Sequence, residues 1–229
     1  WELVQYLADL HHFVYTNLPD DELLWATSMP CAIKGEASIP IAQFGSSNVG
    51  RMKTVYREGL GHRYGRVMQA ISGVHFNYSF PEHFWPVLAD VLRPRDSGQA
   101  FRSESYFSLL RNYRRHGWIV LYLFGNSPAI CPSFLQGRKV DGLEPLAPGS
   151  LYAPYATSLR MSDLGYRNKS QAGLNVSVNS LDHYVRDLTA AISTPNPEYE
   201  KIGRKADDEY REFNANIMQI DNEYYRFIR

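Results

Sequence analysis

Cysteine is scarce in this chain, with Cys31 and Cys131 as the two thiols among 229 residues. Two cysteines so far apart do not define a disulfide framework. A reducing cytoplasm is therefore the expected compartment. Both lie next to a proline in apolar surroundings, and we expect them to be buried, inert thiols.

An excess of positive charge is also missing, because Lys and Arg total 24 and so do Asp and Glu. Recognition of nucleic acid needs a basic surface. Nor does any stretch approach the ~20 apolar residues of a membrane-spanning helix. The first residues show no basic region followed by an apolar run, so no secretory signal is evident. Neither nucleic acid nor a membrane is expected as a partner.

The common enzyme motifs are absent as well. We find no Walker loop, Rossmann fingerprint, zinc-ligand spacing or Gly-x-Ser-x-Gly elbow. The pair Gly59 and Gly61 lies in a helical pattern and lacks the context of a phosphate-binding loop. The chain starts at Trp1 without a Met and stops at Arg229 in what reads as the middle of an element. We therefore expect a segment of a longer protein.

What is present is the ordinary composition of a globular protein, 44% hydrophobic and 21% charged. Apolar spacing of three and four predicts helices over 1–18, 51–64, 103–116 and 180–192. The wholly apolar run 118–124 is expected to be buried, as either helix or strand. Residues 125–173 are expected to be mostly loop, and the alternation over 211–220 predicts a strand. Helices mixed with antiparallel-looking strands indicate the α+β class.

Residues 67–80 carry the most informative pattern, an alternation with a period of two. One face holds Met68, Ala70, Val74, Phe76, Tyr78 and Phe80, and the other Gln69, Ile71, Gly73, His75, Asn77 and Ser79. Alternation predicts a strand with one packed face. Amides, an imidazole and a glycine on the second face are typical of groups that orient ligands or bind metals. The pattern thus predicts the floor of a site.

Candidate partners for this floor lie before and after it in the chain. Tyr56 and Leu60 are four residues apart and share a helix face. Gln69 and His75 would stand ~20 Å apart along a strand, too far to hold one atom but suited to opposite ends of a ligand. His75 is equally consistent with an ordinary hydrogen-bonded histidine. Arg160 is suited to clamp a carboxylate, although a salt bridge within its loop is the more common use of such a residue.

Several blocks of the sequence resemble the proteobacterial type of glutamate–cysteine ligase. The blocks are residues 56–60, 68–77, 122–131, 154–170 and 219–225, in order along essentially the whole chain. The resemblance implies a glutamine synthetase-like curved antiparallel sheet with helices packed outside. It also implies that residues 1–229 are the central part of a single catalytic domain, lacking its N- and C-terminal portions.

The activity implied by the resemblance is ligation of the glutamate γ-carboxylate to the cysteine amine, the first step of glutathione biosynthesis. ATP would phosphorylate the γ-carboxylate, and the amine would displace phosphate from the γ-glutamyl phosphate. The implied partners are L-glutamate, L-cysteine and ATP with Mg²⁺ or Mn²⁺, and the implied state is a monomer.

The resemblance also assigns roles to residues. Tyr56, Leu60, Tyr166 and Tyr225 would line the cysteine pocket, Gln69, Ile71 and Asn77 would position the amino acids, and Arg160 would hold a substrate carboxylate. Arg57 would act near the transferring phosphate or the glutamate. His75 would sit beside a metal ion.

One part of the family pattern is absent from this chain. The glutamates that bind metal in the family lie upstream of residue 1 and downstream of residue 229. His75 alone does not make a magnesium site, because Mg²⁺ favours carboxylate oxygens. The segment by itself is therefore expected to be inactive. Two alternatives stay open: a carboxylate–amine ligase with a different acceptor, and a binding paralogue without catalysis.

Overall fold

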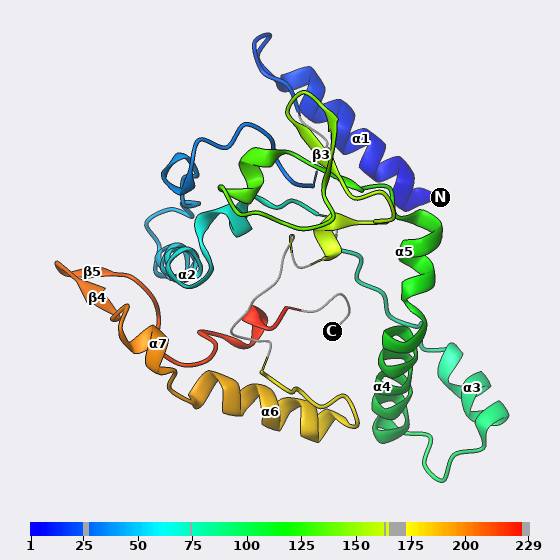
Figure 1. The fold of residues 1–229 in the computed structure, drawn as a ribbon. Helices are drawn as coiled ribbons and strands as arrows, with labels where there is room; N and C mark the ends of the chain where they lie inside the picture. Colours follow the sequence, from blue (N-terminus) through cyan, green and yellow to red (C-terminus); the bar gives the residue numbers. More distant parts are fainter. Residues whose placement is uncertain (25–27, 74, 163, 165–172, 226–229) are drawn as a thin grey trace.

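The computed structural model describes residues 1–24, 28–73, 75–162, 164 and 173–225, and its arrangement is shown in Figure 1. The helices are α1 (Glu2–Asn17), α2 (Asn48–Tyr64), α3 (Phe84–Leu92), α4 (Gln99–His116), α5 (Trp118–Phe124), α6 (Leu181–Ser193) and α7 (Pro197–Glu200). Five short 3₁₀ segments complete the described helical elements: η1 (Glu36–Ser38), η2 (Arg66–Ala70), η3 (Pro132–Leu135), η4 (Leu159–Met161) and η6 (Asp221–Glu223).

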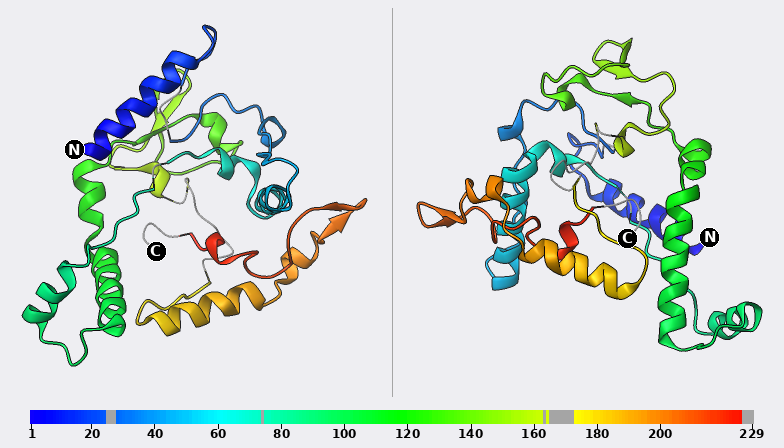
Figure 2. Two further views of the ribbon diagram at one scale, coloured as in Figure 1. Left: turned by 180° about the vertical axis from the view of Figure 1, so that it is seen from behind. Right: turned by 60° about the horizontal axis from the view of Figure 1, so that its bottom comes forward.

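The described strands are short and antiparallel. β1 (Ala129–Ile130), β3 (Ser150–Tyr152) and β2 (Glu144–Ala147) form a sheet in that order, with Ile130 opposite Leu151. β4 (Lys205–Ala206) and β5 (Glu209–Tyr210) form a separate hairpin. Figure 2 shows this hairpin projecting away from the main body beyond α7. The α+β class with antiparallel sheets and outer helices is confirmed.

The four predicted helices are confirmed as α1, α2, α4 and α6. Local signals explain their beginnings, as in α2, where the Ser47 hydroxyl accepts the amide of Gly50 at 3.1 Å. A hydroxyl also begins α6, since Ser180 accepts the amide of His183 at 3.3 Å. An N-cap hydroxyl satisfies an amide that has no partner within the first turn.

The predicted strand over 67–80 is wrong. Its first residues form η2, because the Glu36 carboxylate accepts the backbone amides of both Arg66 and Val67. This side chain, thirty residues away in sequence, draws the backbone into a helical turn, which an alternation pattern cannot reveal. Residues 71–73 and 75–80 follow without a strand, and residues 75–79 are exposed. The described part of this segment is thus an irregular strap rather than a sheet floor.

Two other expectations are corrected. Residues 118–124 form helix α5, which follows α4 because Gly117 has right-handed helical angles (φ −62°, ψ −17°), and they are exposed rather than buried except for the half-buried Leu121. Residues 125–173, expected to be mostly loop, are irregular over most of their described part and hold the short strands β1, β2 and β3. Residues 211–220 form no strand, because side chains such as Asn214 and Gln219 take the hydrogen bonds that a neighbouring strand would supply.

Two apolar clusters form a large part of the described core. The first packs Met29, Val67, Ile130, Phe134, Leu135 and Leu159. The second packs Val176, Ala191, Met218 and Tyr224 beneath α6. The C-terminal segment, red in Figure 1, runs inward alongside α6 and contributes Tyr224 to this second cluster. None of the described helices combines the length and apolarity needed to cross a bilayer.

Candidate functional site

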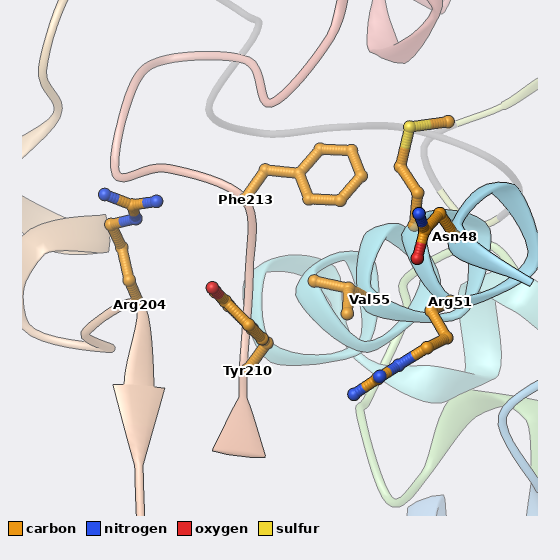
Figure 3. Close-up of a pocket in the computed structure, with 7 residues that line it drawn as sticks. Asn48, Arg51, Val55, Arg204, Tyr210 and Phe213 are labelled. Carbon is orange, nitrogen blue, oxygen red and sulfur yellow. The ribbon is translucent and has the colours of Figure 1, made fainter. Parts of the chain in front are cut away.

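Helix α2 carries a pocket along its first two turns. Its lining repeats at three and four residues, so these side chains share one helix face. Asn48, Arg51, Met52 and Val55 of α2, with Arg204, Tyr210 and Phe213 opposite, enclose about 540 Å³. Figure 3 shows Phe213 and Val55 pointing toward one another across it. Aromatic walls with two guanidinium groups are suited to a small ligand that has both apolar and anionic parts.

The predicted residues Tyr56, Arg57 and Leu60 lie on the adjoining face of α2. The Tyr56 ring packs against Phe213 with centroids 6.2 Å apart, so the pocket and Tyr56 share this aromatic wall. The Arg57 guanidinium lies 5.9 Å from the centre of the Tyr56 ring. Leu60, one turn after Tyr56 in α2, is buried with 4% of its surface exposed.

Gln69 and Ile71 do reach this region, although not by the predicted strand. The Gln69 amide donates to the backbone carbonyl of Arg57 at 2.9 Å, which fixes η2 against α2. Ile71 packs onto the first apolar cluster. The helical turn of η2, rather than a pleated strand, therefore brings Gln69 next to α2.

Arg160 lies over the backbone of residues 72–73. Its Nε donates to the Ser72 carbonyl at 3.1 Å, and a Cβ added at Gly73 would lie 2.3 Å from its Nη2. Glycine at position 73 thus leaves room for the guanidinium. Within the described residues Arg160 has no carboxylate partner, so the alternative of a loop salt bridge finds no support there. A half-buried guanidinium of this kind is suited to bind a carboxylate.

The remaining predicted residues are less closely associated. His75 and Asn77 are exposed on the strap, and Tyr166 lies outside the described residues. Tyr225 follows η6 and is half-buried. In the part of the chain that is described, no three His, Cys, Asp or Glu side chains come together to hold a metal ion. These residues do not by themselves fit a Mg²⁺ site.

A buried polar network behind Tyr56 was not predicted. The Gln219 amide donates to the Tyr56 carbonyl at 3.4 Å, and its Oε1 accepts the Phe213 amide at 3.1 Å. The backbone N–H of Gln219 donates to the Glu223 carboxylate at 2.6 Å. Gln219 is 4% exposed, so these bonds hold the two aromatic residues from within the protein.

Arg63 of α2 anchors this network. Its Nε lies 2.8 Å from Glu212 and its Nη1 3.4 Å from Glu223, with all three side chains essentially buried. Its guanidinium also covers the Tyr199 ring at 4.1 Å. Burial raises the pKa of the Tyr64 hydroxyl, and the Glu223 carboxylate raises it further, so Tyr64 stays protonated and donates to Glu223. The ionic contacts fix the C-terminal segment on α2.

Burial also raises the pKa of Glu212, although the Arg63 guanidinium opposes the rise. Among the described residues, Oε1 of Glu212 has no hydrogen-bond partner. Arg63 therefore supplies the described bond to this carboxylate, and a buried carboxylate without such a bond is costly.

A glycine inside α2 is the sequence signal that could have pointed to this network. A Cβ at Gly59 would lie 2.1 Å from Oε1 of Gln219. Gly59→Ala is expected to destabilise the protein by about 1–2 kcal/mol, because overpacking outweighs the ~1 kcal/mol gain in helix propensity. Urea-induced unfolding measures this change.

Gly61→Ala in the same helix is the matched control. A Cβ there would meet its nearest neighbours, Arg66 and Gln69, at an ordinary 3.4 Å. This variant is expected to gain up to ~1 kcal/mol of stability. If both variants were stabilised equally, Gln219 would not be constrained as described.

Taken together, the α+β fold, the open pocket on α2 and an Arg160 guanidinium without a carboxylate partner among the described residues are suited to a protein that binds small, carboxylate-bearing molecules. A comparison with known families makes this class specific. The chain belongs to the glutamate–cysteine ligase family, whose model matches residues 1–229.

Individual relatives agree with this assignment. The chain is 54% identical to a glutamate–cysteine ligase of Alcanivorax borkumensis, over 99% of this chain and 44% of the relative. It is 53% identical to the Shewanella oneidensis enzyme of the same name, over 99% of this chain and 43% of that relative. The chain therefore spans less than half the length of these curated relatives.

Solved structures give the same result. A crystal structure of glutamate–cysteine ligase from Francisella tularensis in complex with AMP matches 99% of this chain and 44% of that chain. Its TM-score is 0.88 at 39% identity. A bifunctional glutathione synthetase from Pasteurella multocida matches 83% of this chain and 23% of its own, with a TM-score of 0.62 at 28% identity.

Proposed function

We propose that the protein carrying this chain joins the γ-carboxylate of L-glutamate to the amine of L-cysteine at the expense of ATP. Residues 1–229 would form the central part of its catalytic domain. The family membership of the whole chain supports the reaction class. The AMP complex of the Francisella tularensis relative supports a nucleotide as a substrate.

The observation that carries the proposal is the position of Arg160. Its guanidinium is held by the Ser72 carbonyl beside Gly73, and the described residues offer it no carboxylate. A planar guanidinium binds a carboxylate through two parallel hydrogen bonds. We assign to Arg160 the binding of a substrate carboxylate, which orients the amino acid for reaction.

The acceptor site follows from the aromatic wall of α2. We propose that Tyr56 and Leu60, together with Tyr166 and Tyr225, surround the side chain of cysteine. Gln69, Ile71 and Asn77 would orient the amino acids around them. The Tyr56–Phe213 contact and the buried Leu60 support an apolar cavity of limited size there. Such a wall favours a thiol over a charged side chain.

The reaction we propose has two steps. An oxygen of the glutamate γ-carboxylate attacks the γ-phosphorus of ATP, and ADP leaves with the electrons of the broken P–O bond. The cysteine amine then attacks the acyl carbon of the γ-glutamyl phosphate, phosphate leaves and the amine loses a proton. Arg57 would stabilise negative charge near the transferring group, since fixed cations lower the barrier to phosphoryl transfer.

Mg²⁺ or Mn²⁺ would accompany the nucleotide and offset its phosphate charge, with His75 beside the ion. The described residues do not gather the carboxylates that such ions prefer. His75 is exposed on the strap and is free to meet a ligand.

Turnover of ATP by the whole protein tests this proposal. We expect ADP release that requires both glutamate and cysteine, with kcat/KM for cysteine at least ~10-fold above that for alanine or serine. A coupled ADP assay with each amine in turn measures the preference. Equal turnover with all amines would instead support a ligase with another acceptor. Glutamate binding without any ADP release would support a binding paralogue.

A further inference from the structure

The two cysteines, expected to be separate and buried, instead meet near the protein surface. Cys31 is exposed and Cys131 is half-buried. Each thiol lies close enough to the other to act on its pKa. The fold has therefore placed together the two thiols of the chain, which its sequence holds far apart.

Ser133 holds the two cysteine segments in this arrangement. Its hydroxyl accepts the backbone amide of Ile33 at 3.0 Å, between residues 100 apart in sequence. The same hydroxyl lies 3.1 Å from the sulfur of Cys131. Met29 and Ile130, which flank the two thiols along the chain, pack in one buried cluster. These hydrogen bonds and this packing hold the segments that carry the two thiols next to each other.

The backbone at Ala32 is also shaped toward Cys131. Its φ of +56° lies in the left-handed region, which a residue with a Cβ seldom adopts. The backbone of Ala32 lies close enough to the Cys131 sulfur to help lower the pKa of that thiol. Strained backbone of this kind persists where the surroundings enforce it and is common at functional sites.

The two thiols differ in acidity. Burial alone would raise the pKa of Cys131, but hydrogen bonds from the Ser133 hydroxyl and from backbone amides outweigh it and lower that pKa. For Cys31, burial and the neighbouring Cys131 thiolate both raise the pKa. Cys131 is therefore the first nucleophile, since the thiolate is the reactive form.

We propose that Cys31 and Cys131 form a redox-active pair, which a low-molecular-weight disulfide of the glutathione type oxidises reversibly to an intramolecular disulfide. The Cys131 thiolate attacks one sulfur of the small disulfide, breaks its S–S bond and releases one thiolate. The thiol of Cys31 then loses its proton to solvent and attacks the Cys131 sulfur, releasing the second thiolate. The protein loses two electrons and two protons, and the small disulfide becomes two thiols.

The second step is favoured by the first. Once Cys131 carries the mixed disulfide, its negative charge no longer raises the pKa of Cys31. Cys31 then ionises more readily beside the sulfur that it must attack. A resolving thiol next to an accessible, acidic one is typical of redox-sensing cysteines.

The disulfide would also constrain the proposed substrate site. Ser28 exchanges two hydrogen bonds with Ser72, at 2.8 and 2.9 Å, and the Ser72 carbonyl accepts from Arg160. Residues 28–33 therefore connect the cysteine pair to the segment beneath Arg160. This connection does not depend on which amino acids the site binds.

The test treats the reduced whole protein with glutathione disulfide, blocks the remaining thiols by alkylation and maps the peptides without reduction. We expect the Cys31 and Cys131 peptides to be joined with the loss of two hydrogens, and dithiothreitol to separate them. Two alkylated thiols after treatment, or a persistent glutathione adduct without the crosslink, would overturn the proposal. This measurement needs no variant, so it does not depend on how a substitution folds.

Variants then separate the two roles. Cys31→Ser is expected to retain a stable glutathione adduct on Cys131, because the resolving thiol is missing. Modification of Cys31 in Cys131→Ser is expected to be at least threefold slower than modification of Cys131 in Cys31→Ser. Ser133→Ala, which raises the pKa of Cys131, should slow the crosslink about threefold at neutral pH. Faster modification of Cys31 than of Cys131 in these variants would contradict the assigned order.

Discussion

Replacing Arg63 with methionine is expected to destabilise the protein by about 3–5 kcal/mol, because it leaves two buried carboxylates without their cation. Arg63 contacts Glu212 at 2.8 Å and Glu223 at 3.4 Å, and its side chain is fully buried. The methionine retains much of the apolar volume, so the loss reports the charge rather than a cavity. Urea-induced unfolding of the whole protein measures the effect.

Arg186→Met provides the matched surface control. Arg186 pairs with Asp187 at 2.8 Å, as short as the Arg63–Glu212 contact, but its side chain is 65% exposed. Exposed ion pairs contribute little to stability because water screens them. The unfolding midpoint of this variant should match that of the unmodified protein. Equal losses for the two variants would show that burial of the Arg63 cluster has been misassigned.

Arg160→Ala in the whole protein is expected to raise the KM for an amino-acid substrate roughly 100-fold, because a bound carboxylate loses its charged partner. Arg160→Lys keeps the charge but not the planar fork, and an increase of about 10-fold is expected. Initial rates of ADP release over a range of glutamate and cysteine concentrations measure both effects. Unchanged KM values for both amino acids would remove Arg160 from the site.

Gly73→Ala tests the position of the Arg160 guanidinium while leaving the Arg160 side chain itself unchanged. The new Cβ would lie 2.3 Å from Nη2 of Arg160, so the flexible end of that side chain must move. We expect KM to rise ~10-fold, since a displacement of about 1 Å is costly in a substrate-positioning group. Gly173→Ala is the matched control, because among the described residues no atom lies within 4 Å of a Cβ at Gly173. That variant should leave KM unchanged.

Family membership and local chemistry contribute differently to these expectations. The match over residues 1–229 assigns the family but leaves the role of each residue open. The structure adds that Tyr56, Arg57 and Gln69 lie together on α2 and η2, and that Arg160 lies against residues 72–73. It also adds Gln219 and Arg63, which hold this arrangement from behind and carry no motif of their own.

The sequence by itself determined the helices, because helix formation depends on contacts three and four residues apart. Repeated apolar spacing was sufficient for α1, α2, α4 and α6, and hydroxyl caps mark the beginnings of α2 and α6. The resemblance of its ordered blocks also determined the family, together with most of the residues expected at the site.

The tertiary structure decided what depends on partners distant in sequence. The alternation over 67–80 predicted a strand, but the carboxylate of Glu36 captures the amides of Arg66 and Val67 and forms η2 instead. Cys31 and Cys131 meet because Ser133 and Ile33 join their segments across 100 residues. Bringing such distant groups together costs chain entropy that packing elsewhere must offset. No local pattern in the sequence records that balance, so the two cysteines that seemed too few and too far apart became a pair only in the folded chain.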